Sequence, residues 1–450
     1  MMSACDASQR PGRRVLIVTP SFPPANMPDM QRVRMSLPHY SENGWEAIVL
    51  TVAIEQQEGI REDELLATIP PAANIHTCGA VPLACSRLLG LRNLGLRAWW
   101  HLLLAGGTII RREKIDLIFF SNTHFVTFAL GRIWRFLYRI PYVVDLQDPW
   151  RTDYYEQPGA RKPPGGWKYQ VARIQARFLE GWSFRKLSGF ISVSDRYITD
   201  LCARYPWFRQ IPSVTIPFGT SEMDLRVANA IHGATANTPA HDIQAIRLVY
   251  TGAAGPITPH AADVLLHALH SYRKRHPEKA ARLRLEFHGT SYAPAGRAQH
   301  TILPLAREHG VEDLVFENPV RIGHLEALRL QAGADALLLA GSADPAYSPS
   351  KLYPYFLANR PILCLTRRNS VLAELVMSLN CAHLAYFEPN QPNNEAIDSV
   401  CEFFEHSHEG FPAGTVPLRN EELFRREYLA PALTARQCAL FDAAISRSTQ

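Results

Sequence analysis

Short apolar runs alternate with helical stretches along the first half of the chain, and this alternation constrains the fold more than any other feature. "RVLIVTP" is followed by a helical stretch at 30–43 that ends at Gly44, and the apolar run "EAIVLTV" comes next. Short apolar runs bounded by turn residues are typical of strands buried on both faces, and helical connections favour parallel pairing. The runs expected to form strands are 14–19, 46–52, 115–121, 141–147, 189–195 and 213–219.

The alternation stops in a polar segment and then restarts. Residues 226–244, "RVANAIHGATANTPAHDIQ", are rich in Ala, Asn, Thr and Pro without an apolar period, which is typical of a linker. The later strands are expected at 246–252, 283–289, 334–341 and 360–366.

Two such series predict two domains, because one core rarely grows beyond about 250 residues. We predict an α/β protein with two doubly wound, Rossmann-like domains facing a cleft. The expected parts are an N-terminal domain at 1–225, a linker at 226–245, a C-terminal domain at 246–429, and a last helix at 430–450 that packs back on the N-terminal domain or on the other half.

The charge distribution indicates the kind of partner. Residues 1–225 hold 26 Lys and Arg against 20 Asp and Glu, and the whole chain has a net charge of +5. A mildly basic half suits an anionic partner, such as phosphates, an acidic glycan or an anionic membrane surface. No nucleic-acid motif is present and none of the eight cysteines forms a C-x-x-C pair, so we expect neither a nucleic-acid partner nor a metal.

The sequence also predicts where the protein acts. The polar N-terminus leads directly into the first expected strand, unlike a signal peptide, and no run of about 18 apolar residues is present. We therefore expect a cytoplasmic protein. Residues 87–104 combine Trp99 and Trp100 with Arg92 and Arg97. Such a helix can bind peripherally to the inner face of a membrane, although its apolar residues also suit a domain core.

The segment "SPSKLYPYF" at 348–356 is a candidate phosphate site. Ser348 can cap a helix that begins at Pro349, which leaves the backbone N–H groups of Ser350 and Lys351 free. Free N–H groups at a helix start, together with a lysine, favour phosphate. The alternative is an ordinary capped helix with a solvated lysine.

Gly252 and Gly289 each end an expected strand, where the backbone can pass close to a nucleotide. A plain strand-to-helix turn is the alternative for each. No G-x-G-x-x-G fingerprint is present, which disfavours a dinucleotide dehydrogenase.

Carboxylates and aromatic rings gather after the expected strand at 141–147. Asp145, Asp148 and Trp150 lie in "DLQDPWRTDYYEQP", and this combination suits a hydroxyl-rich sugar. A helix start capped by Asp148 is the alternative. His124 follows another strand and either points into the cleft or has a structural role.

Five segments resemble the two-domain GT-B glycosyltransferases of the family-4 group. "IPYVVDLQDPW" resembles their P-x-V-x-D-x-R/H-D-P-W segment, and "PSKLYPYFLANRPILCL" resembles P-S/T-K-L-x-E-Y-L-A-x-G-K/R-P-I-L. "RVLIVTPSFPPANMPDMQRVR…NGWEAIVLT", "FISVSD" and "LVYTG" resemble three further strands with their loops. The resemblance spans roughly residues 14–390.

The resemblance implies retaining transfer of a sugar without a metal or other cofactor. The C-terminal half would hold a nucleotide-sugar donor, and the N-terminal half an acceptor. Where the family carries two glutamates eight residues apart, this chain has Ala346 and Pro354, and Asp344 is the nearest acid. We assign donor binding to Gly252, Gly289, Ser350, Lys351 and Asp344, catalysis to Asp148 and His124, and acceptor binding to Arg32, Asp145 and Trp150.

The expected function is therefore transfer of a sugar to a glycan or a lipid-linked acceptor in polysaccharide assembly. One alternative is a GT-B protein that binds a nucleotide sugar or glycan without turnover. The other is a nucleotide-sugar epimerase, which would need carboxylates around a histidine such as His288 on the donor side.

Overall fold

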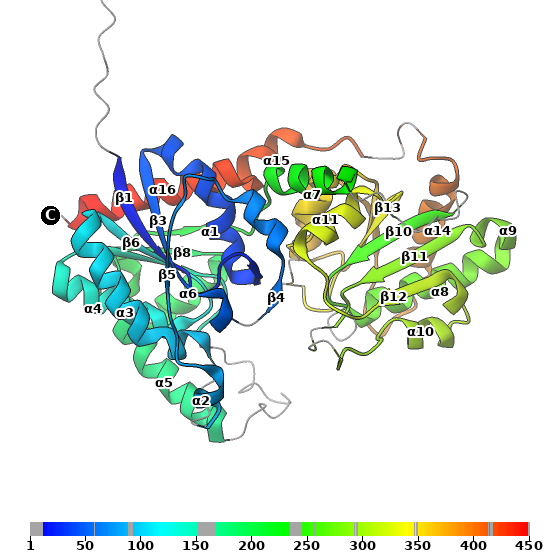
Figure 1. Ribbon diagram of the computed structural model, residues 1–450. Helices are drawn as coiled ribbons and strands as arrows, with labels where there is room; N and C mark the ends of the chain where they lie inside the picture. Colours follow the sequence, from blue (N-terminus) through cyan, green and yellow to red (C-terminus); the bar gives the residue numbers. More distant parts are fainter. Residues whose placement is uncertain are drawn as a thin grey trace, which may run out of the picture. The chain divides into compact units, whose positions relative to one another are not determined.

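The chain divides into two compact units, each built on its own parallel sheet (Figure 1). Unit 1 comprises Met1–Phe218 and Ala430–Gln450, and unit 2 comprises Gly219–Leu429. The computed structural model describes residues 12–57, 59–88, 93–151, 167–234, 245–254, 258–291, 293, 296–345, 347, 350–412, 414 and 417–448. The two sheets show the expected α/β fold class.

The sheet of unit 1 has seven strands, all paired in parallel. Their order is β5 (Asn74–Cys78), β3 (Trp45–Val52), β1 (Arg13–Val18), β6 (Leu117–Ser121), β7 (Tyr142–Leu146), β8 (Gly189–Ser192) and β9 (Ser213–Thr215). The helices of unit 1 include α1 (Gln31–Ser36), α2 (Leu83–Leu88), α3 (Leu94–Glu113), α4 (Phe128–Tyr138), α5 (Trp167–Phe184), α6 (Asp195–Arg204) and α16 (Ala430–Ser448).

Alternate side chains of each central strand enter two separate cores, one on each face of the sheet. Along β1, Leu16 and Val18 join the core that includes α3 and α4, whereas Val15 and Ile17 join the core that includes α1 and α16. Both faces are therefore apolar, which explains why these strands read as continuous apolar runs.

The sheet of unit 2 has six parallel strands. Their order is β12 (Val315–Asn318), β11 (Leu283–His288), β10 (Ile246–Thr251), β13 (Ala336–Ala340), β14 (Ile362–Thr366) and β15 (His383–Tyr386). The helices include α7 (Glu222–Ala234), α8 (Pro259–Arg275), α11 (His324–Ala332), α12 (Leu352–Ala358), α13 (Val371–Leu379), α14 (Asn394–His408) and α15 (Glu421–Tyr428).

The expected linker at 226–245 is corrected by the structure. Residues up to Ala234 form α7, a helix of unit 2, and residues 235–244 lie outside the described part of the chain. His324 Nε2 of α11 lies 2.9 Å from Asp224 Oδ2 of α7, and Ala228 is fully buried. Small alanines pack closely against a neighbouring helix without giving a strong apolar period, which is why the sequence suggested a linker.

The last helix, α16, packs on unit 1. Its Phe441 is fully buried, with ring centroids 5.3 Å from Trp45 and 5.0 Å from Phe119. The chain thus enters unit 2 after Phe218 and returns to unit 1 at Ala430. Within the described residues, no helix is long and apolar enough to cross a membrane.

The packing of α16 gives a test of the division into units. Phe441→Ala should lower the free energy of unfolding of unit 1 by about 3–5 kcal/mol, because it leaves a cavity against Trp45 and Phe119. Hydrogen exchange should then quicken in β1 and β3 but not in β10 and β11. Ala443→Ser, an exposed change on the same helix, serves as the control. Unchanged protection of β1 and β3 in Phe441→Ala would mean that α16 is peripheral to this core.

Candidate functional site

Two glycines and a lysine come together at the carboxyl ends of β10 and β11 in unit 2. Gly252 and Gly289 have left-handed φ angles of +102° and +77°, a conformation that side-chain-bearing residues rarely adopt. A Cβ atom placed on Gly252 would lie 3.3 Å from Lys351 Nζ. The structure therefore brings together three of the residues assigned to the donor.

The Lys351 ammonium group rests on Tyr250. Its Nζ donates to Tyr250 Oη at 2.6 Å and lies 3.9 Å from the centroid of the same ring. Burial lowers the pKa of Lys351 to about 7. No carboxylate of the described residues forms an ion pair with this lysine. An anion at this place would therefore favour the protonated lysine.

Tyr355 joins the helix that follows Lys351 to the end of β10. Its hydroxyl accepts from the backbone N–H of Thr251 at 3.0 Å, which ties α12 to the end of β10. Gln331 of α11 donates to Thr251 Oγ1 at 2.9 Å. Neither Tyr250 nor Tyr355 was predicted from the sequence as a site residue. The only signal for Tyr250 is its place two residues before the glycine that ends the strand.

The helix after Lys351 begins later than expected. It starts at Leu352 instead of Pro349, and Ser348 and Pro349 lie outside the described residues. Ser350 is exposed in the turn that precedes α12. Pro354 is the third residue of α12, where its missing N–H has no partner within the helix, so it does not break the helix.

Asp344 lies in the segment between β13 and α12, and its side chain is exposed. Ala346, the other position of the missing glutamate pair, lies outside the described residues. The structure thus places Asp344 on the same connection as Lys351.

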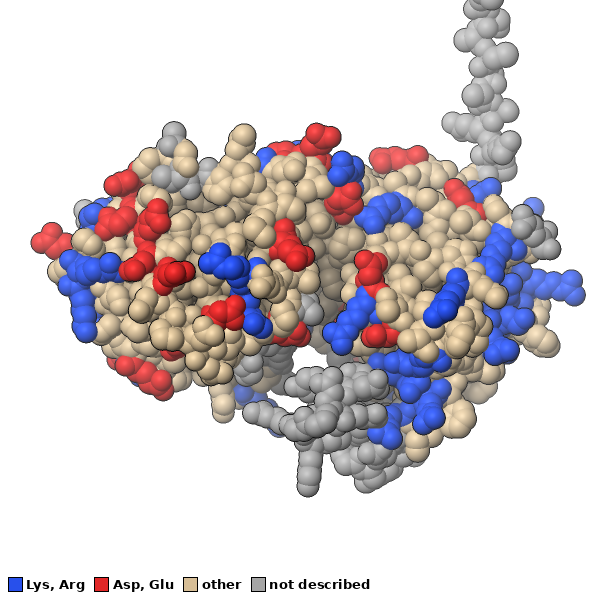
Figure 2. Space-filling view, turned by 180° about the vertical axis from the view of Figure 1, so that it is seen from behind, with Lys and Arg blue, Asp and Glu red and all other residues tan. Residues whose placement is uncertain are grey.

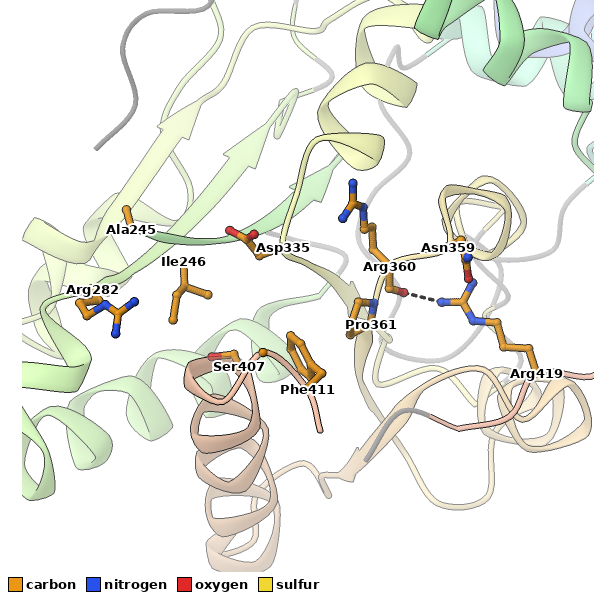
Figure 3. A pocket seen from close by; sticks show the side chains of 11 residues that line it. Ala245, Ile246, Arg282, Asp335, Asn359, Arg360, Pro361, Ser407, Phe411 and Arg419 are labelled. Atoms are coloured by element: carbon orange, nitrogen blue, oxygen red, sulfur yellow. Dashed lines mark hydrogen bonds between the residues drawn. The ribbon is translucent and has the colours of Figure 1, made fainter. Parts of the chain in front are cut away.

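A hollow of about 540 Å³ lies at the opposite edge of the same sheet (Figure 3). Ile246, Asp335 and Pro361 lie at or next to the starts of β10, β13 and β14. Arg419 lines it too, but its guanidinium donates to the carbonyl oxygens of Phe356 and Arg360. Ligands of doubly wound sheets bind beyond the carboxyl ends of the strands, so this hollow is separate from the candidate site.

In unit 1, Arg32 and Asp145 form a buried ion pair. Arg32 Nε lies 2.9 Å from Asp145 Oδ2, and the guanidinium donates to the backbone oxygen of Ile216 at 2.8 Å. Ser121 donates to Asp145 Oδ2 at 2.7 Å, and Gln147 donates to the same oxygen at 3.2 Å.

The assignment of both residues to acceptor contact stays a prediction, which their burial disfavours. Asp145 is fully buried and Arg32 nearly so, which leaves almost no surface for an acceptor. Their contacts instead hold α1 to the ends of β6, β7 and β9, so we interpret them as positioning residues.

His124 and Asp148 occupy the same edge of the sheet. Ser21 Oγ lies 3.3 Å from His124 Nε2, and Asp29 Oδ2 lies 3.8 Å from the same nitrogen. The pKa of Asp148 is raised by partial burial and by repulsion from the Asp29 carboxylate, although the side chain keeps exposed surface. Ser21 and Asp29 were not predicted from the sequence, because they follow the first strand in a loop without a recognisable motif.

Trp150 belongs to an aromatic cluster of unit 1. Its ring stacks on Phe125 at 5.7 Å and meets Phe128 and Phe184 edge-on at 5.7 and 5.9 Å. These contacts account for most of the ring, so its place in the structure suits support of the loop more than stacking on an acceptor. Asp153, Tyr154 and Tyr155, in the same segment of the sequence, lie outside the described residues.

Metal ligands do not cluster in the described part of the chain. No group of three or more His, Cys, Asp or Glu residues there is arranged to hold an ion.

The chain is similar in sequence or in fold to several known proteins. Residues 3–219 match the family described as the glycosyl transferase 4-like domain. HepE of Anabaena, solved in complex with UDP, has 15% identity and a TM-score of 0.54, over 96% of this chain and 99% of that chain. The α,α-trehalose 6-phosphate synthase of Burkholderia multivorans has 10% identity and a TM-score of 0.55, over 98% and 100%.

A third similar structure is WaaG, described as a glycosyltransferase involved in lipopolysaccharide biosynthesis. It has 14% identity and a TM-score of 0.50, over 96% of this chain and 98% of that chain. No curated protein matches the sequence significantly. The match at residues 3–219 spans just under half of the chain and is a likeness to the glycosyl transferase 4-like domain. The likeness to these solved structures, at 15% identity or less, shows that the chain has the GT-B fold.

The buried ion pair leads to a prediction about stability. Arg32→Met should lower the free energy of unfolding by about 3–5 kcal/mol, because it leaves the Asp145 carboxylate buried without its charge partner. Arg32→Met combined with Asp145→Leu should recover part of this loss. Urea unfolding of the two variants measures both effects. Full stability of Arg32→Met would show that the pair is not structural and would return Arg32 to acceptor binding.

Proposed function

We propose that unit 2 binds the diphosphate of a nucleotide sugar at Lys351. The observation that carries this proposal is a lysine beside two glycines at the ends of adjacent strands, whose ammonium group contacts a tyrosine and, among the described residues, no carboxylate. A diphosphate would supply the missing negative charge, and the glycines leave room for close approach of a ligand. Ser350 and Asp344, on the connection to Lys351, complete the proposed donor side.

The proposed donor is a nucleotide sugar. The structure of HepE was solved with UDP, which makes UDP the first nucleotide to test. In the proposed reaction the bond between the sugar and the diphosphate breaks, and negative charge develops on the leaving diphosphate. Lys351 would stabilise this charge, so we propose transfer without a metal. We also propose that the transfer is retaining, as the resemblance to the family-4 group implies.

We propose that unit 1 provides the acceptor side through His124 and Asp148. Both side chains keep exposed surface at the carboxyl edge of the sheet, and the raised pKa of Asp148 favours proton exchange with a hydroxyl group. Arg32, Asp145 and Trp150 hold the surrounding loops. WaaG is described as acting in lipopolysaccharide biosynthesis, which supports a glycan or lipid-linked acceptor in polysaccharide assembly, used at the inner face of the membrane.

The two alternatives make different demands on the donor side. An epimerase needs a histidine with a carboxylate that can exchange a proton. His288 Nε2 does lie 3.2 Å from Glu286 Oε2, but Arg247 holds both oxygens of Glu286 and the pKa of this glutamate falls to about 2. Glu286 is thus a poor proton carrier. A protein that binds a nucleotide sugar without turnover would show the binding effects predicted below but no transfer.

The decisive test is the affinity of Lys351 variants for UDP and uridine. Lys351→Ala removes one charge-assisted contact worth roughly 1.5–3 kcal/mol, so UDP affinity should fall by about one to two orders of magnitude. Uridine affinity should hardly change, since it has no diphosphate. Titration calorimetry measures both ligands, and Lys351→Arg, which keeps a positive charge, is the matched control. Equal losses for UDP and uridine, or none, would place the donor site elsewhere.

The lowered pKa of Lys351 predicts how UDP affinity depends on pH. In the free protein this pKa is about 7, and bound diphosphate should raise it by favouring the charged form. UDP affinity should therefore fall as pH rises above 7, by up to about tenfold per pH unit, with proton uptake on binding. Calorimetry in buffers of different ionisation enthalpy detects this uptake. Lys351→Arg should bind without this pH dependence, and a persisting dependence would exclude Lys351 as the titrating group.

A further inference from the structure

Two adjacent helices of unit 1, α4 and α5, expose large apolar side chains to solvent. Phe136 is 84% exposed and Phe178 is 73% exposed. Three more exposed apolar side chains on these helices are Leu137, Ile174 and Trp182. We refer to these five residues as the α4–α5 face. Several large apolar residues exposed together usually mark an interaction surface.

The residues of this face lie on two helices that contact each other. Ile174, Phe178 and Trp182 are spaced four residues apart on α5, so they share one side of the helix. Arg132 of α4 lies over the Trp182 ring, 4.6 Å from its centroid, and also donates to the Trp182 backbone oxygen at 2.5 Å. The two helices are therefore joined through Trp182.

The opposite sides of both helices pack in the core of unit 1. Phe128 and Trp134 of α4 and Phe184 of α5 are fully buried in the core of unit 1. The α4–α5 face is thus additional apolar surface, beyond what the sheet requires.

The face is surrounded by basic residues. Among the described side chains, the cationic ones on or next to the two helices are Arg132, Arg135, Arg139, Arg173, Arg177, Arg185 and Lys186. The only acid in either helix is Glu180, which is buried and bound by Arg204 at 2.8 Å. Figure 2 shows Lys and Arg gathered over the part of unit 1 where α4 and α5 lie.

We propose that the α4–α5 face docks on an anionic lipid membrane. Exposed Phe and Trp side chains enter the boundary between headgroups and acyl chains, while the surrounding arginines bind lipid phosphates. The docking proposal rests on the proposed function in one respect only: docking would bring the enzyme to a lipid-linked acceptor. Within α4 and α5 the one acid, Glu180, is buried, so the exposed charges of these two helices are basic. This favours an anionic lipid surface over a protein partner, whose surface carries both signs of charge.

This location differs from the helix expected at 87–104. Arg97 is buried and donates to the backbone oxygens of Val81 and Gln56, so it cannot reach lipid. The side chains of Arg87 and Arg92 lie outside the described part of the chain. Trp99 is half-buried and donates to the Val126 backbone oxygen, whereas Trp100 is exposed.

Vesicle sedimentation of the full chain tests the proposal. Wild-type protein should bind vesicles of phosphatidylcholine mixed with phosphatidylglycerol, and should bind pure phosphatidylcholine at least tenfold more weakly. Phe136→Ser with Phe178→Ser should reduce binding to the mixed vesicles at least tenfold, and Arg139→Glu with Arg177→Glu should do the same. Phe136→Trp should retain binding, since Trp also suits the interface.

Matched controls come from exposed residues of unit 2. Leu418→Ser and Arg307→Glu remove an apolar and a basic side chain of comparable exposure, and should leave vesicle binding unchanged. All variants should keep the melting temperature and the UDP affinity of the wild type. This readout separates the two proposals, because a protein that binds UDP but no vesicle refutes only the docking surface.

Three results would overturn the docking proposal. The first is no binding of wild-type protein to the mixed vesicles. The second is equal binding to pure phosphatidylcholine, which would remove the role of the arginines. The third is a dimer in the absence of lipid that Phe136→Ser with Phe178→Ser abolishes, since the face would then be covered by a second copy of the chain.

Discussion

Parallel pairing of buried strands is the constraint on which both candidate sites depend. Every strand of the two main sheets pairs in parallel, so all carboxyl ends within one sheet meet at one edge. Gly252 and Gly289 are distant in sequence but end adjacent strands. Ser121 and Asp145 meet in the same way in unit 1, where they share a hydrogen bond. Polar residues that follow separate apolar runs are thereby collected without any local motif.

Two cations at these edges differ in whether a neighbouring group compensates their charge. Arg32 is buried against the Asp145 carboxylate and backbone oxygens, so its charge is compensated within unit 1. Lys351 contacts the Tyr250 hydroxyl and ring, which do not compensate a full charge, and its pKa falls accordingly. The first arrangement stabilises a fold, and the second favours an anionic ligand.

Much of the fold could be predicted from the sequence, and there is a physical reason for each strand or helix that was not predicted. The central strands were predicted because both their faces are buried, which produces unbroken apolar runs. The edge strand β5 alternates half-buried and exposed residues, and β15 is largely half-buried, so neither gives such a run. The helix α7 was taken for a linker, because small alanines pack on α11 without a marked apolar period.

The sequence by itself determined two α/β series, the glycines at two strand ends, and a lysine next to a short helix with a proline in it. Only the tertiary structure decided which charges are compensated. Asp145 and Arg32 were predicted to bind the acceptor, and the structure shows that they form a buried ion pair. Tyr250 belongs to the candidate site only because it contacts Lys351, which lies 101 positions away in the sequence. The physical reason is that compensation of a charge depends on distance and desolvation in space, and neither can be read from spacing along a chain.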